Sequence, residues 1–490
     1  MTEPVLTLLA GGLLVDGTGG PGWSGDVLIA GDRIAAVGEA LREHPPQSLD
    51  LSAADVIDCR GQVVAPGFID AHTHDDAAVL RTPEYLPKLS QGITTVVTGN
   101  CGISLAPYCT AQARAPLSLL GADAFQYPSM AAYRAAVQAA RPALNVAPLV
   151  GHTTLRFAVM GDDLARPASA DERARMAQLL DACMQDGAFG LSSGLFYDEA
   201  MAAPASEVTE LARVAARHGG VYATHLRSEM QAIIEALHEA GECAFEAGLP
   251  LVISHHKCAG PANWGRTLET LPLIDALGQR QPIAMDVYPY LAGSTVLRED
   301  LVDGVIEVLI TWSEPHPETA GRALAEVAAE WGTTQQEAAR RIKPGGACYF
   351  QMDGADVDRV IAHPRSMIGS DGLPNDRHPH PRLWGAFPRV LAHYWRERGL
   401  LTLEQAVHKM TGLTARNFRL EGRGLLRPGG FADITVFDPA RVADTATYAE
   451  PARISAGITA VYVNGQLAYR EQAQVLARAG RVLALQERGA

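Results

Sequence analysis

The feature of this sequence that most limits its fold is an alternation of short apolar runs with helical stretches. Eight runs have the length and composition of buried strands. They are Val63–Asp70, Thr94–Thr98, Asn145–Val150, Ala188–Ser192, Gly220–Thr224, Leu251–Ser254, Ile283–Tyr288 and Ser366–Ser370. Apolar residues recur at helical spacing in Ala170–Gln185, Glu207–His218 and Ser228–Ala247. This pattern predicts an α/β fold of the (β/α)8 barrel type, with catalytic side chains at the carboxyl ends of the strands.

The two ends of the chain have a different texture. Short strand-like runs bounded by Gly and Asp occur at Leu6–Val15, Asp26–Ile29, Arg33–Val37, Ile434–Phe437 and Val461–Tyr469. The last run contains Asn464-Gly465, a dipeptide that favours a tight hairpin turn. We therefore expect a small β-sandwich domain built from residues 1–62 and 415–490, around a barrel that spans residues 63–414.

The segment 299–346 is longer than one crossover helix requires. It contains Trp312, Trp331 and repeated Ala, Glu and Arg residues of helical character. We interpret it as a helical insertion after the seventh strand, near the face that carries the active site, where a lid is one interpretation of its role.

Charge and cysteine content exclude several classes of protein. Lys and Arg number 41 against 55 Asp and Glu, a net charge of −14, which argues against nucleic acid as a partner. No apolar run approaches the ~18 residues of a membrane span, and Met1-Thr-Glu-Pro4 lacks the basic flank of a secretory signal. The seven cysteines are odd in number and follow no pattern, which argues against a disulfide framework. We expect a cytoplasmic protein that acts on a small molecule; the sequence does not indicate its oligomeric state.

Polar residues follow the strand-like runs where a packed core would be apolar. The candidates are His72 and His74 after the first run, Cys101 after the second, His225 after the fifth, His255 after the sixth and Asp371 after the eighth. His72 and His74 are two residues apart, so an extended chain directs them to the same side. Imidazole, thiolate and carboxylate together suit a divalent transition metal, with zinc as the first choice.

Each of these residues has a simpler interpretation when it is taken alone. A single buried His is often a hydrogen-bonded core residue, and a free cysteine such as Cys101 often behaves as a small apolar side chain. The joint occurrence of these candidates at the ends of five strand-like runs favours the metal site.

The motifs at the strand ends are similar to those of a known family. Gly67-Phe-Ile-Asp-Ala-His72-Thr-His74, with single histidines on strands five and six and Asp371 after strand eight, resembles the amidohydrolase superfamily. More narrowly, the chain resembles the D-aminoacylase (N-acyl-D-amino-acid deacylase) family in segments that run nearly end to end. These are Thr98-Gly-Asn-Cys101-Gly, Ala223-Thr-His225-Leu-Arg, Ile253-Ser-His255-His-Lys257, Ser370-Asp371-Gly-Leu-Pro and Pro379-His-Pro-Arg-Leu-Trp-Gly.

The resemblance implies one tightly held zinc ion on Cys101, His225 and His255. It also implies a second, weaker site formed by His72, His74 and Cys101, with Asp371 nearby. Cys101 would bridge the two sites, a role that a carbamylated lysine fills in many amidohydrolases. His256 follows a ligand on an alternating strand and is expected to point away.

The residue types suggest a hydrolytic mechanism that needs no organic cofactor. Zinc lowers the pKa of a bound water toward ~7 and polarises an acyl carbonyl. Asp371 would take the proton of that water and return it to the leaving nitrogen. A cyclic-amide hydrolase of the dihydropyrimidinase or hydantoinase type, another amidohydrolase, and a catalytically inactive binding protein are the alternatives.

The resemblance also implies a substrate with a carboxylate, so cationic and phenolic groups near the strand ends become binding candidates. These are Tyr197, Lys257, Tyr288, Arg298 and Arg377. An additional buried cation would be matched by an acidic substrate side chain. We therefore expect N-acyl-D-glutamate to be preferred, with Arg377 or Arg298 holding the second carboxylate. A solvated Arg377 in an enzyme of broad specificity is the alternative.

Overall fold

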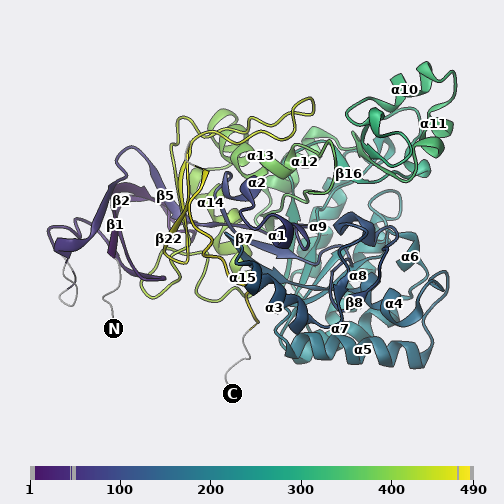
Figure 1. Cartoon of the computed structure of the whole chain (residues 1–490), viewed down its shortest axis with the longest axis horizontal. Helices are drawn as coiled ribbons and strands as arrows, with labels where there is room; N and C mark the ends of the chain where they lie inside the picture. Colours follow the sequence, from purple (N-terminus) through teal and green to yellow (C-terminus); the bar gives the residue numbers. More distant parts are fainter. Residues whose placement is uncertain (1–5, 45, 47–50, 472–473, 486–490) are drawn as a thin grey trace.

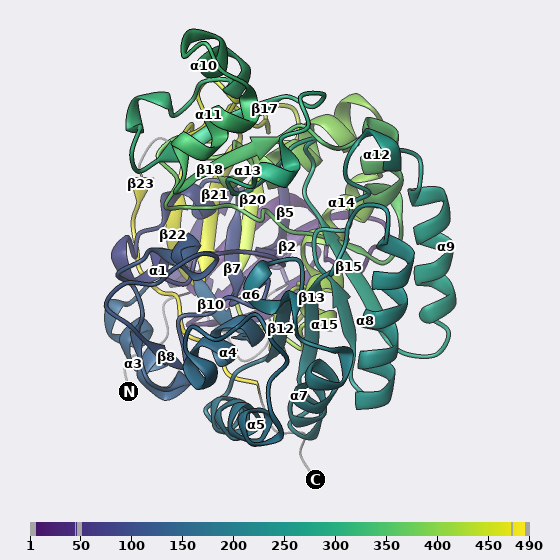
Figure 2. The ribbon, with the colours of Figure 1, turned by 90° about the vertical axis from the view of Figure 1, so that its right-hand side faces the viewer.

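Both ends of the chain join one sheet. The computed structural model describes residues 6–44, 46, 51–471 and 474–485. The sheet has nine strands in the order β23-β22-β21-β20-β5-β1-β2-β3, with β4 paired to β1. The strands are β1 (Leu6–Leu14), β2 (Trp23–Ala30), β3 (Arg33–Gly38), β4 (Asp55–Asp58), β5 (Val63–Pro66), β20 (Ile434–Phe437), β21 (Ile458–Val463), β22 (Gln466–Arg470) and β23 (Gln474–Val475). Figure 2 shows β20, from the C-terminal part of the chain, beside β5, from the N-terminal part, and the finer description as a sandwich stays a prediction.

The first predicted strand is two strands. β5 pairs with β1 and β20 in the terminal sheet, whereas β6 (Phe68–Asp70) pairs with β7 (Ile93–Thr98). Gly67 lies between them, and a Cβ atom at this position would lie 2.3 Å from the Thr94 side chain. Only glycine allows this close approach, so the chain passes from one sheet to the other without a loop.

The middle of the chain forms parallel strands whose carboxyl ends lie on one side. One sheet has the order β10-β7-β6 and another the order β11-β12-β13-β14-β15-β19. The remaining bounds are β10 (Asn145–Pro148), β11 (Val150–Gly151), β12 (Gly190–Gly194), β13 (Val221–His225), β14 (Leu251–Ile253), β15 (Ile283–Val287) and β19 (Ser366–Ile368). The Phe189 amide donates to the Pro148 carbonyl at 2.8 Å and the Ala71 amide to the Ile368 carbonyl at 3.2 Å. Hydrogen bonds therefore connect the two sheets at both edges.

Helices lie outside these strands (Figure 2). They are α1 (Ala78–Arg81), α2 (Leu86–Leu89), α3 (Met130–Ala140), α4 (His152–Met160), α5 (Ala170–Gln185), α6 (Asp198–Met201), α7 (Ala205–Arg217), α8 (Ile233–Ala247), α9 (Thr267–Leu277), α12 (Gly354–Ala362), α13 (Arg382–Arg389), α14 (Leu403–Met410) and α15 (Gly412–Asn417). The bounds of α5 match the prediction, because Ser169 and Glu172 form a capping box at its start. The predicted helix at 228–247 begins only at Ile233, and residues 228–232 form a turn beside the strand ends.

The insertion is not purely helical, which corrects the prediction. β16 (Gly293–Val296), β18 (Gly345–Tyr349) and β17 (Val308–Ser313) form an antiparallel sheet that accompanies α10 (Leu324–Glu330) and α11 (Gln335–Ile342). These elements share an apolar core that includes Ile310, Leu324 and Ile342. The strand β17 is short, and its alternating residues Ile310 and Trp312 give only a weak strand signal. The longer Ala-rich stretches therefore made the whole segment look helical in the sequence. Figure 1 shows α10 and α11 projecting from the end of the molecule opposite the terminal sheet.

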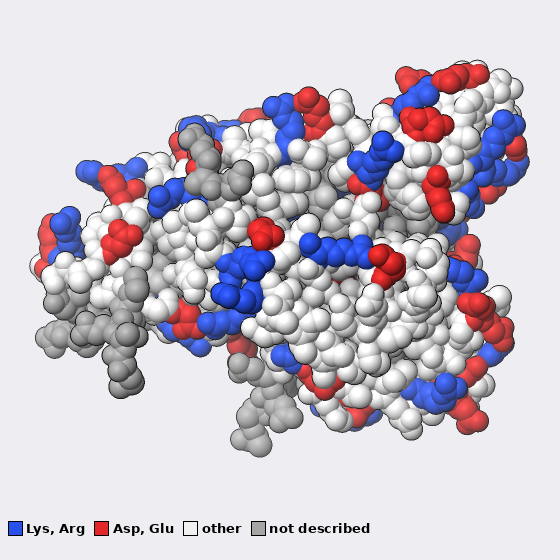
Figure 3. All heavy atoms as spheres, viewed as in Figure 1, with Lys and Arg blue, Asp and Glu red and all other residues white. Residues whose placement is uncertain are grey.

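The surface carries both signs of charge. On the face drawn in Figure 3, acidic and basic side chains lie next to one another in many places, although the net charge of the chain is −14. Among the residues that the structure describes, no helix is both long and apolar enough to cross a lipid bilayer.

Candidate metal centre and active site

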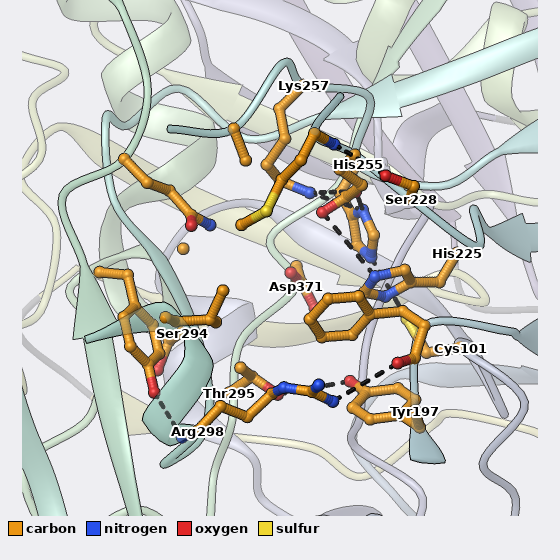
Figure 4. Close-up of a pocket in the computed structure, with 18 of the residues that line it drawn as sticks. Cys101, Tyr197, His225, Ser228, His255, Lys257, Ser294, Thr295, Arg298 and Asp371 are labelled. Carbon is orange, nitrogen blue, oxygen red and sulfur yellow. Dashed lines mark hydrogen bonds and ion pairs between the residues drawn. The ribbon is translucent and has the colours of Figure 1, made fainter. Parts of the chain in front are cut away.

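The predicted ligands meet at the carboxyl ends of the parallel strands. His72 and His74 follow β6, Cys101 follows β7, His225 ends β13 and His255 follows β14. All five side chains are buried. Because parallel strands end on the same side, residues up to 183 positions apart in sequence converge (His255 minus His72). Figure 4 shows Cys101, His225, His255 and Asp371 facing one cavity.

Cys101 belongs to two groups of possible ligands. One group is His72, His74 and Cys101, the other is Cys101, His225 and His255, and the ligand atoms of each group lie within 4.8 Å of one another. The Cys101 sulfur lies 3.2 Å from His72 Nε2 and 3.4 Å from His255 Nε2. The thiol therefore lies between two clusters of imidazoles.

The donor atoms fit a divalent metal ion. Both ring nitrogens of His225 are buried and make no hydrogen bond to the described part of the chain, although such bonds are nearly obligatory for buried polar atoms. Burial opposes ionisation of the Cys101 thiol, but the imidazoles of His72 and His255 hold its pKa well below the ordinary value. A thiolate and an unpartnered imidazole are the ligands that zinc prefers.

Three residues of the site have backbones in the left-handed region. The φ angles are 54° for Cys101, 35° for His255 and 49° for Asp371. This conformation is costly for residues with a Cβ atom and persists only where the surroundings enforce it. The Asp371 amide donates to the His72 carbonyl at 2.8 Å, and the His255 amide donates to Asp286 Oδ1 at 2.9 Å. These bonds between strand ends hold the turns that aim the side chains.

Two carboxylates that the sequence analysis missed orient the histidines. Asp286, within β15, lies 3.3 Å from His72 Nδ1, and Glu229 lies 3.0 Å from His255 Nδ1. Each leaves Nε2 directed to the cluster, the usual arrangement behind metal-bound histidines. An acidic residue within the apolar run Ile283–Val287 was a signal that could have revealed Asp286.

Asp371 lies at the centre of the cluster. Its Oδ1 is 3.5 Å from His72 Nε2 and 3.3 Å from His74 Nε2, while its Oδ2 forms an ion pair with Arg382 Nη1 at 3.0 Å. Burial opposes ionisation of Asp371, but Arg382, His72 and His74 hold its pKa well below the ordinary range. Asp371 is therefore a carboxylate at neutral pH. Arg382 stands in the Pro379–Gly385 motif, yet its wholly buried side chain was not recognised from sequence.

Comparison with known proteins agrees with this geometry. The family model described as "Amidohydrolase family" matches residues 55–292 and 333–469. A D-aminoacylase of Alcaligenes xylosoxydans xylosoxydans is 51% identical over 99% of this chain and 98% of its own length. The chain belongs to the D-aminoacylase group of the amidohydrolase family. An N-acyl-D-aspartate deacylase (49% identical, over 97% of this chain and 94% of its own) and an N-acyl-D-glutamate deacylase (47%, over 99% and 97%) of the same organism are further relatives.

Solved structures extend the likeness to the fold. A D-aminoacylase has a TM-score of 0.93 at 50% identity and covers 98% of this chain and 99% of its own. An N-acyl-D-glutamate deacylase from Bordetella bronchiseptica, complexed with zinc and a phosphonate inhibitor, has a TM-score of 0.92 at 44% identity, over 98% of this chain and 100% of its own. The chain therefore has the TIM-barrel fold of the amidohydrolases.

A buried ion pair lies behind the His-X-His motif of this amidohydrolase. Asp70 Oδ1 accepts the amide of the ligand candidate His72 at 3.3 Å and that of Ser370, which precedes Asp371, at 2.8 Å. Lys88 donates from Nζ to Asp70 Oδ2 at 2.7 Å and to Ser370 Oγ at 2.5 Å. Asp70 and Lys88 are wholly buried. They hold the end of β6 against the end of β19.

Four of the five predicted substrate-binding residues line a cavity of about 180 Å³ over the cluster; these are Tyr197, Lys257, Tyr288 and Arg298. Arg377 does not join them, and its predicted role is not supported. Its exposed side chain donates to the Pro317 carbonyl of the insertion at 3.3 Å, because the His378 amide bonds the Thr311 carbonyl and turns this loop outward. His256 points away from the cluster, as strand alternation predicts, and its Nε2 lies 2.8 Å from Thr270 Oγ1.

The first prediction concerns Lys88. Lys88→Met leaves Asp70 and Asp75 buried without their cation, which costs about 3–5 kcal/mol of stability when one partner of a buried pair is removed. We expect weaker binding of Zn²⁺, measured by titration, because Lys88 no longer links the ends of β6 and β19. Lys409→Met is the matched control, since Lys409 is a buried lysine that bonds the carbonyls of His363 and Ser366 before β19. Equal effects on zinc titration in both variants would contradict this role.

The second prediction concerns Cys101. Cys101→Ala removes the ligand that both groups share. Loss of a residue that only orients a ligand typically lowers metal affinity by ~10–100-fold, so loss of this ligand should lower the affinity further. We therefore expect less bound metal in elemental analysis after dialysis. Cys258→Ala is the control, because burial raises the pKa of Cys258 to about 12 and it belongs to neither ligand group. Retention of full metal content in Cys101→Ala would rule out the site.

Proposed function

We propose that the chain hydrolyses the amide bond of N-acyl-D-amino acids to a D-amino acid and a carboxylate. The observation that carries the proposal is the cluster of two imidazole pairs around the Cys101 thiol, with Asp371 between them, in a member of the D-aminoacylase group. The buried site excludes bulk water from all but the cavity, so its charges act at low dielectric.

Cys101, His225 and His255 would hold one tightly bound metal ion, and His72 and His74 with Cys101 a weaker second one. We expect zinc, from the mixture of thiolate and imidazole donors. A metal bound there supplies a water of lowered pKa and polarises the acyl carbonyl. Asp286 and Glu229 contact Nδ1 of His72 and His255, and so keep these rings in the orientation that directs Nε2 to the metal site.

Asp371 carries the proton transfers. Its ionised carboxylate accepts a proton from the attacking water, and it then donates that proton to the nitrogen of the leaving amine. The Arg382 guanidinium at 3.0 Å favours the carboxylate in the first step and fixes its second oxygen. The left-handed backbone of Asp371 accompanies the direction of its carboxylate toward His72 and His74.

The α-carboxylate of the substrate would bind among Tyr288, Lys257 and Arg382. The guanidinium carbon of Arg382 lies 4.4 Å from the centre of the Tyr288 ring, and Lys257 Nζ lies 5.8 Å from it. Arg382 is wholly buried and does not line the cavity, so it would favour an anion there through its positive charge beside Tyr288. Glu229 fixes Lys257 at 2.5 Å and determines where its charge lies.

The choice of substrate side chain rests on Arg298. The three relatives are named for different substrates at 51, 49 and 47% identity, so identity does not select one. Arg298 lies at the cavity and pairs with Asp300 through two contacts of 3.0 Å. The Asp300 side chain is 59% exposed, so its carboxylate can return to water when a substrate carboxylate replaces it. N-acyl-D-glutamate therefore stays the predicted preference.

A substrate panel tests the reaction class. We expect turnover of N-acetyl-D-amino acids, little turnover of the L-enantiomers, and none of hydantoin or dihydrouracil. Cleavage of the cyclic amides in place of the linear ones would establish the cyclic-amide alternative.

The third prediction assigns the proton transfers to Asp371. Asp371→Asn should lower kcat by ~10²–10⁴-fold, the usual contribution of general acid–base catalysis, with KM little changed. Asp376→Asn is the control, because Asp376 is a buried carboxyl of the same loop that faces the insertion. A loss of kcat smaller than tenfold in Asp371→Asn would contradict the role.

The fourth prediction concerns specificity. Arg298→Met should lower the ratio of kcat/KM for N-acetyl-D-glutamate over N-acetyl-D-leucine by about ten- to a hundredfold, the range of one charge-assisted hydrogen bond. Arg377→Met should leave the ratio unchanged, because this side chain lies on the surface. An unchanged ratio in Arg298→Met would indicate an enzyme of broad specificity.

A further inference from the structure

A second and larger cavity lies beside the metal cavity. It encloses about 910 Å³ between the segment 112–122 and the base of the insertion. Its apolar walls come from both sides and include Ala113, Pro116, Val296, Leu297 and Trp312. None of the proposed catalytic steps uses this space.

The two cavities share part of their walls. Leu119, Tyr197 and Arg298 line both of them. The Tyr197 ring centre lies 5.5 Å from that of His225, and the Tyr197 hydroxyl is 3.4 Å from Thr295 Oγ1. The shared wall therefore stands directly beside the cluster of metal-ligand candidates, and one long hydrogen bond links its Tyr197 hydroxyl to Thr295.

The direction of a bound substrate follows from the charges. The α-carboxylate belongs at the end of the cavity that holds Lys257, and Figure 4 shows Lys257 and Tyr197 at opposite ends with Asp371 between them. The scissile carbonyl lies between the two ends, so the acyl group continues toward Tyr197. The metal cavity, at about 180 Å³, is roughly five times smaller than the space beyond that wall.

The cations around the second cavity already have partners. Arg114 pairs with Asp162 and Lys343 with Glu299 at 3.2 Å, while Arg298, at the shared wall, is the cation assigned to the side-chain carboxylate of the substrate. Glu199 and Glu314 add further negative charge to the lining. An acyl group with its own carboxylate would meet repulsion there, whereas an uncharged aliphatic chain would bury apolar surface against Leu297 and Trp312.

We propose that this second cavity is the subsite for the acyl group, and that it accepts straight aliphatic acyl chains longer than acetyl. The inference rests on the proposed deacylase function and adds the class of acyl substituent. Leu119 and Tyr197 form the passage between the two cavities, and the segment 112–122 with the base of the insertion forms the chain-binding walls.

A chain-length series tests the proposal on the metal-loaded enzyme. The substrates are N-acetyl, N-butyryl, N-hexanoyl and N-octanoyl derivatives of one D-amino acid. Each buried methylene contributes about 0.8 kcal/mol, equivalent to about fourfold, so we expect kcat/KM to rise by up to that factor per methylene beyond acetyl. An N-succinyl derivative, which carries a carboxylate, should be turned over less well than N-butyryl.

Variants locate the effect. Ser118→Trp fills the second cavity from a wall that the metal cavity does not share, and it should abolish the gain with chain length while N-acetyl turnover stays within about twofold. Ser206→Trp, at an exposed position in the first turn of α7, is the matched control and should leave the series unchanged. If Ser118→Trp does not fold, Val296→Phe fills the same space from the opposite wall.

The outcomes separate this inference from the proposed function. No turnover of any N-acyl-D-amino acid would overturn both. Good turnover of N-acetyl substrates with falling kcat/KM for longer chains would overturn the acyl subsite alone. A gain with chain length that persists in both cavity-filling variants would also overturn it, because the chain would then bind elsewhere.

Discussion

The site depends on the matching of charges that have been removed from water. Five metal-ligand candidates and Asp371 lie together with almost no exposure. An unpaired charge in such surroundings costs several kcal/mol, so each needs a partner. Asp286 and Glu229 face the imidazoles, Arg382 faces Asp371, and Lys88 faces Asp70. The thiolate of Cys101 and the ring nitrogens of His225, which make no hydrogen bond among the described residues, are the groups that a metal ion would bind.

This matching also determines the backbone around the site. Asp70 accepts the amide of His72 and that of Ser370, which precedes Asp371, and Asp286 accepts the amide of His255. Side chains from one strand therefore fix the turns of another. The left-handed backbones of His255 and Asp371 lie at these bonds, in agreement with the tendency of strained backbone to occur where function needs a particular direction.

Different parts of the barrel end supply the metal-ligand candidates and the candidate substrate-binding groups. The strand ends supply the ligand candidates, whereas the insertion and the residues just before it supply Thr295, Arg298 and one side of the second cavity. The loop after Asp371 bonds the insertion through His378 and Arg382, which donate to the carbonyls of Thr311 and Ser294. Hydrogen bonds therefore link the loop of Asp371, which would transfer the protons, to the insertion, which would select the substrate.

The sequence alone determined the alternation of strands and helices and the residues at the strand ends. Strand alternation predicts that His72 and His74 share a side and that His256 points away, since both follow from local geometry. The sequence did not reveal Glu229, Arg382 or the antiparallel sheet of the insertion, and it assigned Arg377 to a site that this residue does not reach. Loop side chains are directed by contacts with distant segments: Arg377 bonds Pro317, and Arg382 reaches Asp371 from the start of α13. Only the tertiary structure decides such contacts, because no local periodicity encodes them.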